Sequence, residues 1–184
     1  MNTLILGGAR SGKSRFAQEL ARKMSGDVLF VATAEAGDSD MHRRIQAHKK
    51  ERPSEWHTLE ATTGIGTCIE QNTGDVKVVL IDCITLLVNN VLCQHNTKEM
   101  ETIEDPVLET EVMNEINQLV QCMQKVNTNF IIVSNEVGLG LVPDNRMGRL
   151  YRDLLGKANQ ALSQSMDEVY LLVAGIPLKV KPTA

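Results

Sequence analysis

Short runs of nearly continuous apolar residues recur along the chain and predict buried strands. The runs are TLIL from Thr3, VLFVAT from Val28, VKVVLID from Val76, FIIVSN from Phe130 and EVYLLVAG from Glu168. Between them, apolar residues return every three or four positions, which is the spacing of an amphipathic helix. Strands that alternate with helices are typical of a parallel sheet covered on both faces. The pattern therefore predicts an α/β fold, with a single domain over residues 1–184.

The helical spacing is clearest in three stretches. Their apolar positions are Phe16, Ala17, Leu20, Ala21 and Met24; Leu108, Val112, Ile116, Leu119 and Met123; and Leu150, Tyr151, Leu154, Leu155, Ala158 and Leu162. Asp105 and Pro106 predict the cap and first turn of the second helix. Residues 95–107 lack clear periodicity, which favours a loop. The acidic side chains between Lys98 and Glu115 predict a solvated, negatively charged surface.

Composition narrows the classes of function. The formal net charge of −4 at pH 7 argues against general binding of nucleic acid, and the 3% of aromatic residues leave little for stacking on bases. The four cysteines form no C-x-x-C pair, so their spacing indicates neither a zinc site nor a disulfide framework, and a reducing cytoplasm is expected. No apolar run approaches the roughly 18 residues of a membrane helix, so we expect no stable membrane insertion.

A glycine-rich segment, GGARSGKS at residues 7–14, directly follows the first predicted strand and matches the phosphate-binding pattern G-x-x-x-x-G-K-[ST]. In such a P-loop, backbone N–H groups surround phosphate oxygens, the lysine neutralises the β- and γ-phosphates, and the hydroxyl binds Mg²⁺. We therefore expect Lys13 to act on the transferring phosphate and Ser14 to hold the metal. The residues expected to bind nucleotide are Gly7, Gly8, Ala9, Arg10, Ser11, Gly12, Lys13 and Ser14.

Asp82 ends an apolar strand, which is where P-loop enzymes place the acidic residue that holds Mg²⁺ directly or through water. Ligands of open α/β sheets bind beyond the carboxyl ends of the strands. Gly7, Thr33, Asp82 and Asn135 all fall at such ends, so we expect them to converge around one nucleotide.

The stretch RIQAHKKERPSEW, residues 44–56, places a histidine among basic residues. If a helix begins near residues 38–40, Arg44, His48 and Arg52 lie on one face of it before Pro53 ends it. Such a face suits an anionic ligand, because arginine binds phosphate oxygens in a fork and a neutral imidazole offers a nucleophilic nitrogen. The spacing alone favours a charged surface helix with an incidental histidine.

Several segments together resemble the adenosylcobinamide kinase/adenosylcobinamide-phosphate guanylyltransferase family of cobalamin synthesis. They are GGARSGKS, RIQAHKKERPSEWHTLE, DCITLLVNN, SNEVGLGLVPDNRMGRLYRDLLGKANQ and VAGIPLKVK, and they span nearly the whole chain. The resemblance implies a RecA-like, mostly parallel sheet with an antiparallel C-terminal edge, for which IPLKVKP supplies the strand. It also implies that adenosylcobinamide is phosphorylated with ATP or GTP and then receives GMP from GTP. Family members associate as trimers, so a homo-oligomer is implied as well.

The same resemblance implies roles for individual residues. His48 takes GMP as a covalent intermediate and passes it to the corrinoid phosphate. Further nucleotide contacts are implied at Thr33, Lys49, Lys50, Glu51, Arg52, Glu60 and Asp82, with Glu60 at the guanine or ribose and Asp82 serving Mg²⁺. The polar residues of the Gly-rich loop after the fourth predicted strand, Asn135, Glu136 and Asp144, are expected near the large second substrate.

Two other functions remain compatible with the residues. A small-molecule P-loop kinase would transfer only the γ-phosphoryl group and use Arg44, His48 and Arg52 as a phosphate clamp, without a covalent intermediate. A nucleotide-gated regulatory or DNA-binding module of RecA-like shape is disfavoured by the negative net charge.

Overall fold

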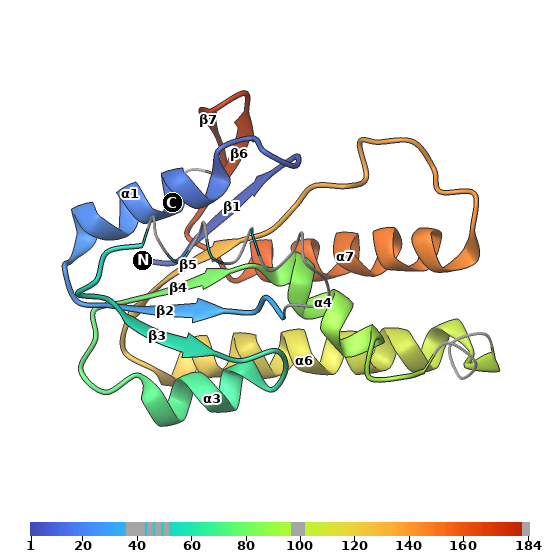
Figure 1. Cartoon of the computed structure of the whole chain (residues 1–184), viewed down its shortest axis with the longest axis horizontal. Coiled ribbons are helices and arrows are strands. Elements are labelled where there is room, and N and C mark those ends of the chain that lie inside the picture. The colour runs from blue at the N-terminus through green and yellow to red at the C-terminus, as the bar shows by residue number, and fades with distance from the viewer. Residues whose placement is uncertain (36–42, 44–45, 47–48, 50–51, 97–101, 182–184) are drawn as a thin grey trace.

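The computed structural model describes residues 1–35, 43, 46, 49, 52–96 and 102–181. They form a seven-stranded sheet in the order β3-β2-β4-β5-β1-β6-β7 (Figure 1). The strands are β1 (Thr3–Gly7), β2 (Val28–Ala32), β3 (His57–Glu60), β4 (Val78–Asp82), β5 (Asn129–Val133), β6 (Glu168–Val173) and β7 (Ile176–Lys181). Neighbouring strands pair in parallel except for β7, which runs antiparallel to β6. The predicted mostly parallel sheet with an antiparallel C-terminal edge is confirmed.

Helices cover both faces of this sheet (Figure 1). They are α1 (Lys13–Met24), α3 (Ile65–Asn72), α4 (Ile84–Leu92), α6 (Asp105–Lys125) and α7 (Arg146–Gln164). Alternate residues of a strand point to opposite faces, so each central strand supplies both layers. In β4, Val78 and Leu80 pack on the side of α1, whereas Val79 and Ile81 pack against the helices of the other face. This two-sided burial is the reason that the central strands have continuous apolar sequences.

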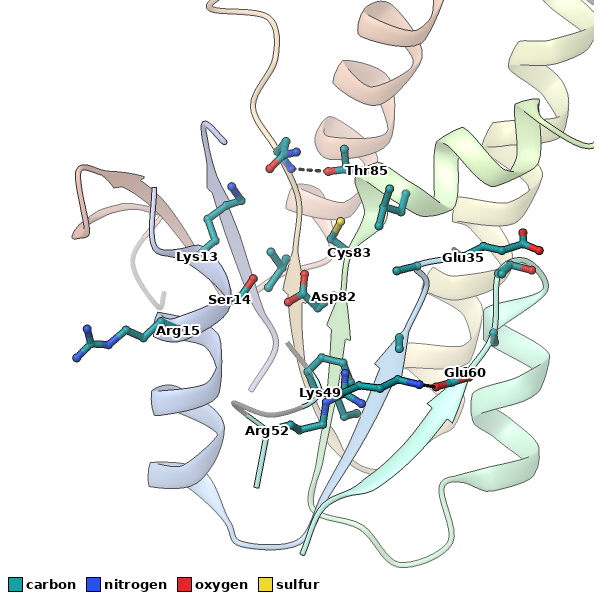
Figure 2. A pocket seen from close by; sticks show the side chains of 18 of the residues that line it. Lys13, Ser14, Arg15, Glu35, Lys49, Arg52, Glu60, Asp82, Cys83 and Thr85 are labelled. Atoms are coloured by element: carbon teal, nitrogen blue, oxygen red, sulfur yellow. Dashed lines mark hydrogen bonds and ion pairs between the residues drawn. The ribbon is translucent and has the colours of Figure 1, made fainter. Parts of the chain in front are cut away.

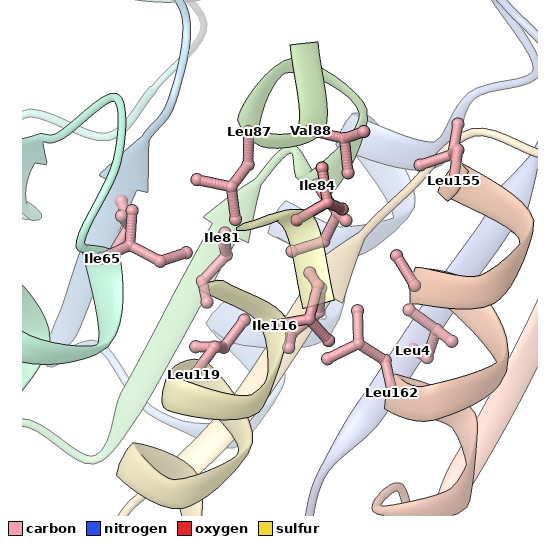
Figure 3. Packing of buried hydrophobic residues seen from close by; sticks show 14 of the residues in the cluster. Leu4, Ile65, Ile81, Ile84, Leu87, Val88, Ile116, Leu119, Leu155 and Leu162 are labelled. Carbon is pink, nitrogen blue, oxygen red and sulfur yellow. The ribbon is translucent and has the colours of Figure 1, made fainter. Parts of the chain in front are cut away.

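The larger core lies between the sheet and helices α3, α4, α6 and α7 (Figure 3). Ile116 of α6 and Leu155 of α7 meet Leu4 of β1 and Ile81 of β4 there, and all four are fully buried. Each such side chain contributes about 1.5–3 kcal/mol through burial, so this layer holds the strand ends firmly in place. The apolar stripes predicted for the second and third helices are the faces that pack here. In the described part of the chain, no helix is long and apolar enough to cross a bilayer.

The start of α6 differs from the expectation. Residues 105–107 are helical rather than loop, and the N-cap is Glu104 rather than Asp105. The Asp105 carboxylate instead pairs with Arg146 at the start of α7. The Asp105 side chain thus joins the starts of α6 and α7 by an ion pair, and it does not cap α6 as the local sequence predicts.

The expected acidic surface is wrong at Glu115, which is buried. Its carboxylate accepts hydrogen bonds from the backbone N–H groups of Gly64 and Ile65, at 2.9 and 3.0 Å. These amides begin α3, and a helix start leaves its first N–H groups without partners inside the helix. A carboxylate there also suits the positive end of the helix dipole. Glu115 thus fixes the turn that follows β3.

β3 itself is not predicted by the apolar pattern. It is an edge strand whose sequence, HTLE, is mostly exposed to solvent, so it lacks the apolar run of a central strand.

Candidate functional site

A cavity of about 1290 Å³ opens at the carboxyl ends of the parallel strands (Figure 2). Its lining includes Ala9 to Ser14 of the P-loop, Arg15 of the first helix, Phe30, Glu35, Gln46, Lys49, Arg52, Glu60 to Thr63, Asp82, Cys83, Thr85 and Asn135. These residues come from widely separated parts of the sequence, and the common direction of the strands brings them together. Of the predicted nucleotide residues, the structure gathers the P-loop from Ala9 onward with Lys49, Arg52, Glu60 and Asp82.

The P-loop wraps into the start of α1. Gly12 precedes the helix with φ +93°, a left-handed conformation that favours glycine. Lys13 is only 7% exposed, and its Nζ donates a hydrogen bond to the Gly8 carbonyl at 2.6 Å. Burial lowers the pKa of the Lys13 ammonium, while nearby Cys83 and Asp82 oppose that shift. The Lys13 ammonium group is therefore held inside the P-loop by one hydrogen bond, at the position where this loop receives phosphate.

The first two glycines of the P-loop do not line this cavity. A side chain at Gly7 would bring its Cβ within 2.6 Å of the Leu172 carbonyl oxygen on β6, so glycine permits the close approach of these strands. Gly8 lines a separate cavity of about 260 Å³, together with Ser11 and Glu136.

Ser14 and Asp82 are suited to hold Mg²⁺. Both line the cavity, from the first turn of α1 and the end of β4, and their oxygens point toward one another in Figure 2. Hydroxyl and carboxylate oxygens are the hard ligands that Mg²⁺ prefers, and it keeps most other positions for water and substrate phosphates. Within the described ranges no cluster of three or more His, Cys, Asp or Glu side chains is arranged to hold a metal. The small donor set thus fits a metal that arrives with nucleotide.

Thr33 lies behind the cavity wall rather than in it. Its side chain is fully buried, and its Oγ1 donates to the Cys83 carbonyl at 2.7 Å and accepts from the Cys83 N–H at 2.8 Å. The hydroxyl therefore fixes the backbone directly after Asp82. Thr33 therefore supports the backbone of the cavity wall, and it is not among the lining residues, where a nucleotide contact is expected for it.

His48 lies outside the described residues, as do Arg44, Lys50 and Glu51. Arg43, Gln46 and Lys49 are helical, in agreement with a helix in this stretch, but Arg52 lies in a bend. The expected helical position of Arg52 is wrong because a residue before proline, here Pro53, is disfavoured in the helical conformation.

Lys49 and Glu60 form an ion pair of 2.5 Å at one wall of the cavity (Figure 2). The Lys49 and Glu60 side chains are 40% and 61% exposed, so the pair contributes little to stability by itself. It does place one cation and one carboxylate at the end of the cavity formed by β3. Arg52 also lines this side of the cavity and is half-buried.

Sequence reasoning missed the residues that hold the loops of this wall. Asn90 of α4 donates from Nδ2 to two backbone carbonyls, those of Thr33 at 2.8 Å and Thr62 at 3.0 Å. One side chain thus ties the loop after β2 to the loop after β3. The sequence signal for Asn90 is weak: it is one of three polar residues on a mostly apolar helix, ITLLVNNVL.

Asn135 is held from several directions at the end of β5. Its N–H donates to Thr85 Oγ1 at 2.8 Å, and its carbonyl accepts from Asn159 Nδ2 at 3.0 Å. Tyr151 in turn donates its hydroxyl to the Thr85 carbonyl at 3.0 Å. Asn135 faces the cavity as expected, whereas exposed Asp144 is not part of the lining.

Comparisons with known proteins relate this chain to one family. A family model described as cobinamide kinase / cobinamide phosphate guanyltransferase matches residues 3–180. The bifunctional adenosylcobalamin biosynthesis protein CobU of Salmonella typhimurium is 38% identical over 182 residues, which cover 98% of this chain and 100% of that protein. The corresponding CobP of Pseudomonas aeruginosa is 36% identical over 181 residues, 98% of each chain.

Among solved structures, an ATPase from the type III secretion system of pathogenic bacteria superposes with a TM-score of 0.56 at 11% identity. The match covers 94% of this chain and 51% of that chain, and it shows a shared fold alone. The α/β fold predicted for a P-loop protein is confirmed, and so is the predicted family. The chain belongs to the cobinamide kinase / cobinamide phosphate guanyltransferase family.

Proposed function

We propose that this one cavity carries out both reactions of the family, and that GMP passes through His48. The observation that carries the proposal is the convergence of Lys13, Asp82, Lys49 and Arg52 on a single cavity. Lys13 and Asp82 are the groups that phosphoryl transfer requires, and Lys49 and Arg52 flank His48 in the sequence. A large shared cavity allows a nucleotide and the phosphate-bearing arm of a corrinoid to meet in it.

In the kinase step, the hydroxyl oxygen of adenosylcobinamide attacks the γ-phosphorus of ATP or GTP. The new O–P bond forms as the β–γ bridging bond breaks, the hydroxyl proton is released, and the nucleoside diphosphate leaves. Lys13 leaves the Gly8 carbonyl and places its charge at the β- and γ-phosphates. Ser14 and Asp82 would hold Mg²⁺, which neutralises the charge on the leaving phosphate when it is bound. The protein contributes position and charge and forms no bond to substrate.

In the guanylyl step, a ring nitrogen of His48 attacks the α-phosphorus of GTP. A P–N bond forms, the α–β bridging bond breaks, and pyrophosphate leaves against Lys13. A phosphate oxygen of adenosylcobinamide phosphate then attacks the same phosphorus and displaces His48. A histidine nucleophile divides one difficult displacement into two easier ones.

Glu60 is the proposed contact of the guanine base or ribose. A carboxylate accepts hydrogen bonds, and guanine offers N–H donors at adjacent positions of its edge. Glu60 lines the cavity across from Lys13 and Ser14 (Figure 2) and is paired with Lys49. The guanine or ribose of GTP would therefore replace Lys49 as the partner of this carboxylate.

The test separates the two chemistries at His48. His48→Ala should lose label transfer from α-labelled GTP to protein and the guanylylated product, yet keep phosphorylation of adenosylcobinamide from γ-labelled nucleotide. His57→Ala, in exposed β3, is the matched control and should keep both reactions. If His48→Ala still forms the guanylylated product, the covalent role is wrong. If wild type phosphorylates but never guanylylates, the chain is a kinase alone.

We also propose a homo-oligomer, a trimer by family resemblance. The C-terminal hairpin supports this, because Val173, Ile176, Leu178 and Val180 are each more than half exposed on β6 and the edge strand β7. Exposed apolar side chains on an edge strand are typical of a surface that pairs with another chain. Sedimentation of wild type should give a trimer, and Leu178→Lys should shift it toward monomer; a monomeric wild type would overturn the proposal.

A further inference from the structure

A chain of aromatic contacts supports Arg52. Its guanidinium carbon lies 3.6 Å from the centroid of the Phe30 ring. Phe30 is stacked on Trp56, with ring centroids 6.4 Å apart and an angle of 25° between planes. Arg22 of α1 lies 5.9 Å from the Trp56 ring. The two rings thus stand between a cation of the cavity and a cation of the first helix.

Arg52 is also held by the neighbouring strand. Its Nη1 donates to Thr58 Oγ1 at 3.0 Å, and Thr58 is the direct partner of Phe30 in the pairing of β3 with β2. The ring and the hydroxyl that touch the guanidinium therefore come from paired positions of two adjacent strands. Phe30 and Trp56 are both buried, which leaves them little freedom to move.

The Arg52 guanidinium is fixed in place although not all of its N–H donors are hydrogen-bonded within the described residues. Arg52 Nε is buried and has no hydrogen-bond partner in the part of the chain that the structure describes. Burial lowers the pKa of Arg52, and the carboxylates of Asp82 and Glu60 oppose that shift. An aromatic face attracts a cation through the ring quadrupole but does not occupy its N–H donors, whereas a carboxylate partner would.

We propose that Phe30 and Trp56 are positioning residues that hold the Arg52 guanidinium in the cavity, with its remaining N–H groups directed to the phosphates of GTP. This inference rests on the proposed function. It explains why the R-P-x-x-W segment contains both an arginine and a tryptophan. Pro53 ends the helical conformation, and Trp56 stacks on the Phe30 ring that contacts Arg52. A fixed guanidinium fork loses less conformational freedom when it binds phosphate than a mobile one.

The primary variant is Phe30→Leu, which removes the ring and keeps an apolar side chain. Titration calorimetry with GTP and Mg²⁺ should show affinity weakened by roughly 2- to 30-fold, the range expected for a cation–π contact. Phe30→Tyr keeps the ring and should bind GTP like wild type. Trp56→Leu, which removes the second ring, should weaken binding in the same direction but less.

A matched control separates positioning from general stability. Phe130→Leu makes the same change at a fully buried phenylalanine of β5, in the core on the opposite face of the sheet. It should lower the unfolding midpoint and leave GTP affinity unchanged. If Phe130→Leu weakens GTP binding as much as Phe30→Leu does, the effect is one of stability and the proposal is overturned.

A double-mutant cycle tests whether Phe30 acts through Arg52. The losses caused by Phe30→Leu and Arg52→Lys should not multiply, and the double variant should bind GTP about as weakly as Arg52→Lys alone. Losses that multiply, or unchanged affinity in Phe30→Leu and Trp56→Leu, would overturn the positioning role. These outcomes are distinct from failure of the proposed function, in which wild type forms no GMP adduct even though it binds GTP.

Discussion

Thr33→Val removes two hydrogen bonds while nearly preserving the volume of the side chain. In wild type, the Thr33 hydroxyl donates to the Cys83 carbonyl and accepts from the Cys83 N–H. Valine leaves both backbone groups without this partner in a site where Thr33 is fully buried. An unsatisfied buried polar group costs about 1–3 kcal/mol; both hydrogen bonds here are only partly buried, so we expect about 1–2 kcal/mol for each and a loss of roughly 2–4 kcal/mol in the free energy of unfolding.

The position of this turn makes the prediction functional as well. Cys83 follows Asp82 directly, so a displaced turn moves the carboxylate that is proposed to serve Mg²⁺. We expect the Mg²⁺ concentration for half-maximal turnover to rise severalfold in Thr33→Val, with partial recovery at high Mg²⁺. For a chain of this size the stability loss corresponds to a fall of about 4–16 °C in Tm.

Thr128→Val is the matched control for this experiment. The Thr128 hydroxyl donates a single hydrogen bond of 2.9 Å to the Val76 carbonyl, just before β4 and therefore at the opposite end of that strand from Asp82. It should lose about 1 kcal/mol in urea denaturation, with unchanged Mg²⁺ dependence. The reasoning is refuted if Thr33→Val is no less stable than Thr128→Val, or if its Mg²⁺ dependence equals that of wild type.

Other perturbations give separate expectations. Lys13→Ala should slow both reactions about a hundredfold or more, because both leave charge on the same phosphates; kinase turnover retained in this variant would contradict a shared site. Asn90→Ala should raise the KM for GTP several-fold by releasing the two loops, whereas Asn89→Ala, its exposed neighbour on α4, should not; equal KM values would show that the tie is dispensable. Burial raises the pKa of the Cys83 thiol to about 11, so at pH 8 little thiolate forms, and iodoacetamide should modify exposed Cys93 well before Cys83 in peptide maps. Faster modification of Cys83 than of Cys93 would contradict the raised pKa of the Cys83 thiol.

Sequence patterns predict the elements whose burial is regular. The central strands have apolar runs because both of their faces are covered, and α6 and α7 repeat apolar residues because one face of each packs on the sheet. β3 gives no such signal because it is an exposed edge strand. The sequence also contains the signal that places Arg52 outside the helix, since a residue before proline is disfavoured in the helical conformation.

The site could be predicted where the chemistry is local and not where it depends on contacts across the fold. The P-loop and Asp82 stand next to strand ends in the sequence, so their convergence follows from the direction of the strands. The support of Arg52 by Phe30 depends on the register of β2 with β3, which no local pattern contains. Likewise, nothing in its local sequence marks Glu115 as the residue that receives the first amides of α3.

The central claim is that GMP passes through His48, and intact-mass spectrometry tests it most directly. Wild-type protein incubated with GTP and Mg²⁺, without corrinoid, should gain the mass of one GMP. Addition of adenosylcobinamide phosphate should remove that mass as guanylylated product appears. The same protein with His48→Ala should show no gain. Formation of product by wild type with no adduct at any time, or an adduct on His48→Ala, would contradict the account.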